Sequence, residues 1–303
     1  MLSPLQAIDR IRAVFDPPPG YRSLHSKGRF YGGTFTATPE ATALCRAAHL
    51  DGQPHEVTVR WSNAGGNPTV PDKVPDIRGM AVKFHQPEGS VGGSATDLLG
   101  QTSPRFPTDS PEVFVQLTEA SDKPWKLPLF LARNPKTLPA TIASLRGHAV
   151  SSPITFAEVT FYPIHAYGWL AADGARTWVR YIFRPTATKA DRLDQQFEGP
   201  DRLPEEMLAR LARGPVTHEV WVQVAGEGHD PHRATSVWDG CRELLAGRIV
   251  VTAEVDDPEG GSMSATPVVF DPTRVVDGIE LSDDPILRYR PGAYTESVSR
   301  RTA

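Results

Sequence analysis

The chain of 303 residues is poor in cysteine and carries no large excess of charge of one sign. Its two cysteines, Cys45 and Cys241, are too few for a disulfide framework and lack the paired spacing of a zinc site. Lys and Arg number 32 against 36 Asp and Glu, a net charge of -4 that favours neither a nucleic acid nor an anionic membrane as partner. We therefore expect packed, reduced thiols and no nucleic-acid function.

Long apolar runs are also missing. No stretch approaches the ~20 apolar residues of a membrane span. Asp9 and Arg10 interrupt the N-terminal segment before the apolar part of a signal peptide could form. The sequence thus predicts no membrane partner and a cytoplasmic location.

Proline and glycine are abundant, at 29 and 25 residues, which indicates many turns and few long helices. In contrast, residues 56–62 alternate apolar and polar side chains, a pattern typical of a strand with one buried face. This strand would place Trp61 on one face and both Arg60 and Ser62 on the other.

Similar patterns predict further elements along the chain. Strands are expected at 80–85, 155–166, 177–183, 218–225 and 247–255. Helices are expected at 5–15, 110–120, 134–146, 189–197, 204–212 and 234–245. No linker divides the chain, and the glycine-rich stretch 259–262 is interpreted as a surface loop. The predicted class is α+β, centred on a mainly antiparallel sheet or barrel.

Residues 21–28, Tyr-Arg-Ser-Leu-His-Ser-Lys-Gly, resemble the distal histidine motif of haem catalases. Four further segments resemble that family in the same order, at 59–62, 76–84, 97–104 and 270–294. Full catalases have a longer N-terminal arm and further C-terminal helices, so the chain is most similar to the small catalase-related haem peroxidases. The resemblance implies that residues 1–303 form a single catalase-like haem domain, an eight-stranded antiparallel β-barrel with surrounding helices that holds one haem b.

By this resemblance, Tyr294 is the ligand of the haem iron. A phenol has an ordinary pKa of about 10 and needs help to bind iron as a phenolate near neutral pH. Arg290 lies four residues earlier, on the same face of a helix, where its guanidinium can stabilise the phenolate. This helix is expected to begin at Ser282, and Pro291 in its interior predicts a kink.

On the other side of the haem, the resemblance makes His25 the group that takes a proton from peroxide and returns it to the departing oxygen. Ser62 corresponds to the serine that orients this histidine. Gln101 stands where the family usually has asparagine, and Phe106 and Pro107 stand where it has paired phenylalanines. Both departures lie on the distal side and predict inefficient dismutation.

The haem propionates require cationic partners with planar donors, for which arginine is suited. The resemblance assigns Arg22, Arg60 and Arg301 to this task. It also assigns Phe114 to packing against the face of the haem.

These assignments predict a haem peroxidase that responds to oxidative stress, with hydrogen peroxide or an organic peroxide as oxidant and a small organic molecule as electron donor. Its catalase activity is expected to be weak. A true catalase, a fatty-hydroperoxide isomerase or dehydratase, and a haem-binding protein without activity remain alternatives. The missing arm argues against the tetramer of full catalases and leaves a homodimer as the expectation.

Overall fold

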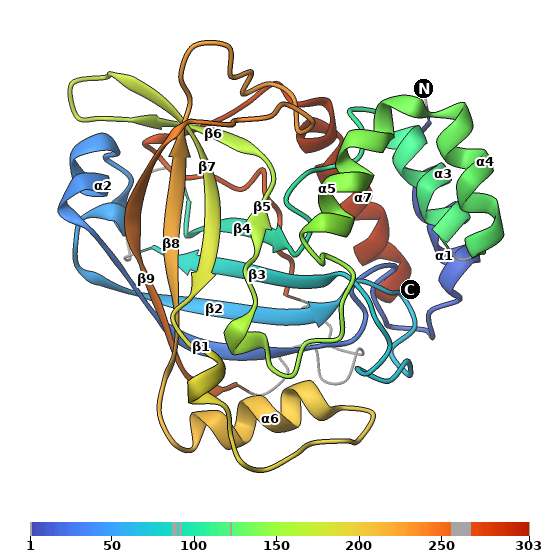
Figure 1. Cartoon of the computed structure of the whole chain (residues 1–303). Helices are drawn as coiled ribbons and strands as arrows, with labels where there is room; N and C mark the ends of the chain where they lie inside the picture. The colour runs from blue at the N-terminus through green and yellow to red at the C-terminus, as the bar shows by residue number, and fades with distance from the viewer. Residues whose placement is uncertain (1, 87–89, 91–92, 122, 256–267, 303) are drawn as a thin grey trace.

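A curled antiparallel sheet forms the body of the computed structural model, which describes residues 2–86, 90, 93–121, 123–255 and 268–302 (Figure 1). Its ten strands lie in the order β10-β6-β7-β8-β9-β1-β2-β3-β4-β5. In chain order they are β1 (Gly28–Ala37), β2 (Pro54–Asn63), β3 (Arg78–His85), β4 (Ala95–Gln101), β5 (Tyr162–Pro163), β6 (Ala166–Leu170), β7 (Arg176–Pro185), β8 (Val216–Val224), β9 (Arg242–Glu254) and β10 (Ile279–Leu281). Phe161, next to β5, exchanges backbone hydrogen bonds of 2.9 and 2.8 Å with Phe183 of β7. The sheet therefore curls back on itself.

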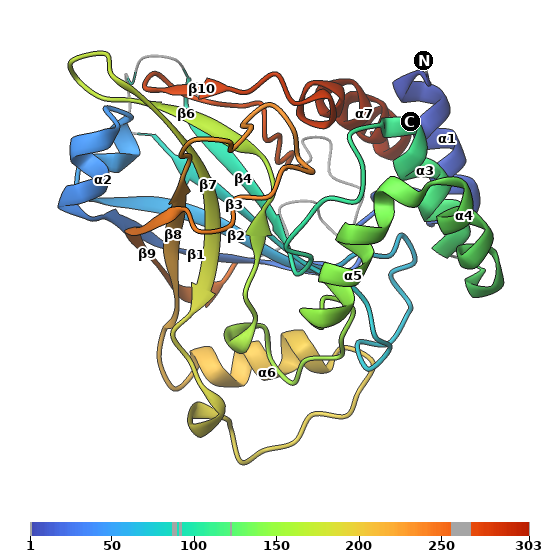
Figure 2. The same ribbon diagram turned by 45° about the horizontal axis from the view of Figure 1, so that its top comes forward.

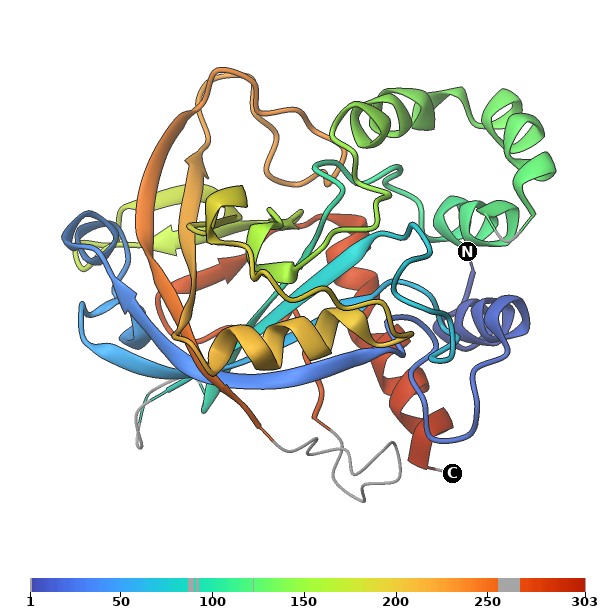
Figure 3. The same cartoon turned by 60° about the horizontal axis from the view of Figure 1, so that its bottom comes forward.

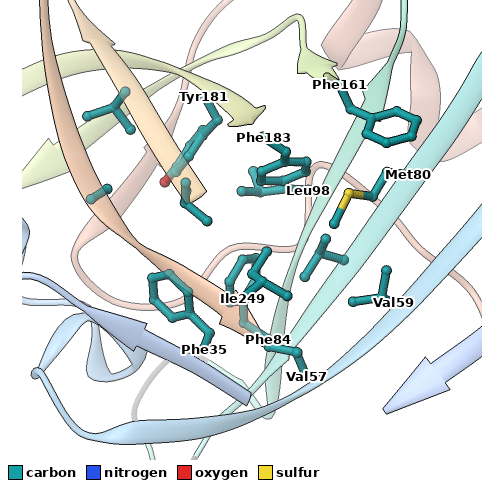
Figure 4. Close-up of a cluster of buried hydrophobic side chains, with 14 of the residues drawn as sticks. Phe35, Val57, Val59, Met80, Phe84, Leu98, Phe161, Tyr181, Phe183 and Ile249 are labelled. Carbon is teal, nitrogen blue, oxygen red and sulfur yellow. The ribbon is translucent and has the colours of Figure 1, made fainter. Parts of the chain in front are cut away.

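The interior of the curled sheet is filled by the inward side chains of its strands. Val59 of β2 and Met80 of β3 point towards Phe161 and Phe183 (Figure 4). Trp61 belongs to the same cluster and is completely buried. Successive side chains of a strand point to opposite faces, so this packing turns Arg60 and Ser62 away from the apolar cluster.

Helices gather mainly on one side of the sheet (Figures 1 and 2). The described α-helices are α1 (Pro4–Phe15), α2 (Pro39–Leu44), α3 (Pro111–Ser121), α4 (Leu127–Arg133), α5 (Leu138–Arg146), α6 (Arg202–Leu211) and α7 (Pro285–Thr302). Five of them, α1, α3, α4, α5 and α7, lie on one side, whereas α6 runs beside β1 at another face (Figure 3). None of the helices in the described part of the chain combines the length and apolar character needed to cross a bilayer.

Most expected elements are confirmed, but three are wrong. The expected helix 234–245 instead leads into β9, which pairs with both β1 and β8. Of the expected helix 189–197 only a single 3-10 turn forms, at Lys189–Asp191. The expected strand 155–166 begins as a 3-10 turn at Phe156–Glu158. The predicted loop at 259–262 lies outside the described residues.

The expected count of eight strands is not matched by the ten-stranded sheet. One reason is that the chain leaves the sheet between β5 and β6, where two side chains pack against α7 instead. Ile164 packs in a cluster with Ile286, and His165 Nδ1 lies 2.7 Å from Asp284 Oδ2. The short β10, paired with β6, adds another strand.

Buried histidines make the stability of this fold depend on pH. Burial lowers the pKa of His49 from 6.5 to about 3, and those of His165 and His218 to about 4. The unfolded chain takes up these protons below pH 6.5, whereas the folded chain resists protonation until about pH 3 to 4. The free energy of unfolding is therefore expected to fall below pH 6.5, by about 1.4 kcal/mol per pH unit for each histidine.

Urea unfolding between pH 7 and about 5 measures this slope. The variant His218→Phe keeps an aromatic ring beside Trp61 and Phe161 but cannot be protonated, so its slope should be shallower. Equal slopes for the two proteins would contradict the assignment.

Candidate active site

A cavity of about 260 Å³ lies between the ends of strands β2, β3 and β4 and the helices α1, α3 and α7. All the site residues expected from the sequence line it: Arg22, His25, Arg60, Ser62, Gln101, Phe114, Arg290, Tyr294 and Arg301. They come from segments far apart in the chain, so the fold brings the expected site together in one place.

His25 is held in one wall of this cavity by its backbone and by Ser62. The backbone N–H of His25 donates to the carbonyl of Ala64. Its φ of 55° lies in the left-handed region that non-glycine residues seldom adopt. The Nδ1 atom lies 3.0 Å from Ser62 Oγ. Gly79 makes room for this pair, because a Cβ there would lie 2.8 Å from both the imidazole ring and Ser62 Oγ.

The charge state of His25 follows from its surroundings. Desolvation of the enclosed ring, followed by the nearby guanidinium groups of Arg60, Arg290 and Arg22, lowers its pKa to about 3. The imidazole is therefore neutral near pH 7 and has one nitrogen that can accept a proton.

Four arginines, Arg22, Arg60, Arg290 and Arg301, line the cavity, and no Asp or Glu does so among the described residues. Arg60 and Arg301 are largely buried, at 5% and 9% exposed. These guanidinium groups give the cavity a cationic lining, which suits a ligand with negative charges.

Tyr294 and Arg290 face the cavity from α7, which continues through Pro291. Burial raises the pKa of the Tyr294 phenol, and the Arg290 guanidinium acts in the opposite direction. Arg290 Nη1 is buried and has no hydrogen-bond partner among the described residues. A cation bound to the Tyr294 oxygen would favour the phenolate despite its burial. Arg290 Nη1 could then donate a hydrogen bond to an anionic group nearby.

The helix that carries this pair begins later than expected. It starts at Pro285, and Asp284 rather than Ser282 caps it, because Asp284 Oδ1 accepts a hydrogen bond of 2.9 Å from the backbone N–H of Ile286. A capping carboxylate suits the positive end of the helix dipole.

The catalase family model matches residues 18–303 of the chain. The chain belongs to the catalase family. It is 40% identical to the catalase-related peroxidase of Mycolicibacterium paratuberculosis, over 99% of this chain and 95% of that protein. It is 28% identical to the catalase-related peroxidase of Synechococcus elongatus, over 99% of this chain and 89% of that protein.

A crystal structure of a fungal catalase has the same fold, with a TM-score of 0.75 and 20% identity. The match covers 97% of this chain and 61% of that catalase. Catalases are haem enzymes, which agrees with a cavity that combines a phenol, arginines and an apolar lining.

The structure locates the two places at which the sequence departs from the expected family pattern. Gln101, at the end of β4, pairs with Gly79 of β3 and lines the cavity. Phe106 stacks on Phe114, with ring centroids 5.0 Å apart, and so completes an apolar wall despite the neighbouring Pro107.

Sequence reasoning missed a buried pair at the start of α7. His165 Nδ1 and Asp284 Oδ2 are 2.7 Å apart and both side chains are 1% exposed. Burial and the charge of Arg290 lower the pKa of His165 to about 4. Burial alone would raise the pKa of the Asp284 carboxyl, but the contact with His165 outweighs this effect and lowers that pKa. These residues are 119 positions apart in the chain, and no local pattern marks His165 as a partner.

Proposed function

We propose that the protein is a haem-dependent peroxidase that uses hydrogen peroxide or organic peroxides to oxidise small organic donors, with weak catalase activity. The observation that carries this proposal is the cavity that His25 and Ser62 share with Arg290 and Tyr294. The similarity to catalase-related peroxidases over nearly the full chain supports it.

We further propose that the cofactor is haem b. Tyr294 would bind the iron through its phenolate oxygen, assisted by Arg290, and Phe114 would pack against the macrocycle. Arg22, Arg60 and Arg301, which line the cavity, would hold the propionates. The bound haem would supply the electrons needed to cleave the O–O bond of peroxide.

The chain's own residues would handle the protons. Ser62 engages His25 Nδ1, which leaves Nε2 to take the proton from peroxide and return it to the departing oxygen. The lowered pKa of His25 keeps this nitrogen available as an acceptor at neutral pH. A charged imidazolium would have no lone pair for the first step.

An optical spectrum of the purified protein, together with two activities measured at equal peroxide, tests the proposal. We expect a Soret band with a high-spin ferric pattern, and dye oxidation that exceeds oxygen evolution. Oxygen evolution as the dominant activity would instead identify a true catalase, and the absence of both activities would leave a haem-binding protein.

Gln101 should influence the balance between these activities. Its side chain is one methylene longer than asparagine, so it would hold peroxide differently. Dismutation requires two peroxide molecules per cycle and peroxidation only one, so a displaced amide affects dismutation more. An error of about 1 Å in position can cost on the order of 10² in rate. We expect Gln101→Asn to raise the ratio of oxygen evolution to dye oxidation, and an unchanged or lower ratio would show that this amide does not set the balance.

Two sequence-based expectations are also part of the proposal. We propose a homodimer, which sedimentation of the purified protein would test, and a cytoplasmic location, which cell fractionation would test.

A further inference from the structure

Residues 123–157, which include α4 and α5, differ in charge from the rest of the chain. They contain five Lys or Arg residues and no Asp or Glu, although the whole chain has a net charge of -4. All five are exposed: Lys123, Lys126, Arg133, Lys136 and Arg146. None of the five forms an ion pair or a side-chain hydrogen bond within the described part of the chain. This part of the surface is therefore strongly cationic.

The same segment exposes large apolar side chains. Trp125 is 73% exposed, Leu145 68% and Leu129 54%. Leu138 and Ile142 are exposed as well. Single exposed apolar side chains are common on protein surfaces, whereas a group of them marks an interaction site. These five apolar side chains and the five basic ones together form the basic face.

Helical spacing places the two kinds of side chain of the basic face next to each other. Leu129 and Arg133 lie four residues apart in α4 and so share one side of that helix. Leu138 and Ile142 share a side of α5 in the same way, and Arg146 continues this row. The helix α4 lies at the outer edge of the helical side of the molecule, away from the sheet (Figures 1 and 2). The basic face is thus open to a large partner.

Apolar and cationic groups side by side discriminate between possible partners. A nucleic acid would use the cations but would leave the apolar side chains in water. A second copy, paired by two-fold symmetry through this face, would bring the five cations of each copy against those of the other. An anionic membrane surface uses both kinds of group, because apolar side chains enter the boundary between headgroups and acyl chains while Lys and Arg reach the phosphates. Tryptophan is enriched at this boundary.

We propose that the basic face docks the protein on the surface of an anionic phospholipid membrane. Trp125 and Leu129 enter the boundary between headgroups and acyl chains, and Arg133 stays at the level of the phosphates. The attachment is peripheral, since no helix in the described part of the chain is long and apolar enough to cross a bilayer. The net charge of the whole chain predicted no membrane partner because it includes the acidic residues, all of which lie outside residues 123–157.

Co-sedimentation of the purified protein with lipid vesicles tests the inference. Vesicles made from equal parts of phosphatidylcholine and phosphatidylglycerol should bind the wild type, whereas vesicles of phosphatidylcholine alone should bind it much more weakly. Added salt should weaken binding to the mixed vesicles, because it screens the attraction between exposed cations and lipid phosphates.

Variants at exposed positions separate the two contributions and should leave the fold intact. Each cation near an anionic surface contributes about 5-fold in affinity, so Lys126→Gln combined with Arg133→Gln should weaken binding to the mixed vesicles by about 25-fold. Trp125→Ala should weaken it by about 10-fold through lost apolar contact. Lys189→Gln combined with Arg213→Gln is the matched control, because it removes the same charge from exposed positions outside the basic face. The control should bind like the wild type.

Failure of the wild type to bind the mixed vesicles, or equal weakening in the control, would overturn the inference. Sedimentation without lipid adds a second test. If the double variant at Lys126 and Arg133 lowers the oligomeric state, the basic face is an interface between protein copies and the inference is wrong. Vesicle binding is measured without peroxide, so its outcome is separate from that of the proposed peroxidase function.

Discussion

Replacing Tyr294 with phenylalanine is expected to cost the protein its haem or to change the ligation of the iron. The variant removes the one oxygen that the proposed site directs at the metal, while the ring and its packing in α7 remain. Losing a residue that merely supports a metal ligand typically costs 10- to 100-fold in affinity, so losing the ligand itself should weaken haem binding by at least about 10²-fold. Haem content and the Soret spectrum of the purified variant measure the effect.

Tyr289 provides a matched control on the same helix. It also lines the cavity, but its hydroxyl donates to the carbonyl of Leu2 at 3.2 Å. Tyr289→Phe should therefore keep the haem content and the spectrum of the wild type. An unchanged spectrum in Tyr294→Phe would show that another residue holds the iron.

Replacing His25 with alanine should slow peroxide cleavage at least ~10²-fold, because the variant has no group to move the proton between the two oxygens. Haem should stay bound, since His25 is not a proposed ligand of the iron. Stopped-flow absorbance after mixing with peroxide measures the rate. His49→Ala is the control: its pKa is also lowered to about 3, but it does not line the cavity.

The pKa of His25 adds a second test of its role. Since the ring is neutral above about pH 3, the wild-type cleavage rate should be flat between pH 5 and 8 and should fall only as the pH drops towards that value. A near-normal rate in His25→Ala would refute the distal assignment. A wild-type rate that already falls through pH 6.5 would show instead that the histidine titrates with an ordinary pKa.

Local patterns were sufficient for several elements of the fold. Residues 5–15 were expected as a helix, and α1 spans Pro4–Phe15, with a capping box between Ser3 and Gln6 and an end at Asp16. Alternation in β2 placed Trp61 opposite Arg60 and Ser62. Such features depend on neighbours within a few residues, which is why the sequence alone is enough to identify them.

Local sequence patterns predicted the wrong element, or none, where pairing with distant residues decides the structure. No local pattern predicted a strand at Gly28–Ala37, yet β1 lies between β2 and β9 in the sheet. Its Gly33 packs so closely on the backbone of Val250 that any Cβ would collide with β9. The glycines that weaken the strand pattern are thus needed for sheet packing. The expected helix 234–245 failed for a similar reason, because its last residues, 242–245, pair with β8 at the start of β9.

The sequence by itself was enough to propose the site residues, because motifs similar to those of catalases occur in the family's order and each motif is short. Only the tertiary structure decided what these residues meet. The pairing of His165 with Asp284 at the start of α7 and the enclosure that makes His25 neutral both depend on contacts between distant segments. Burial and charge at such contacts are properties of the packed chain, and no local pattern of residues encodes them.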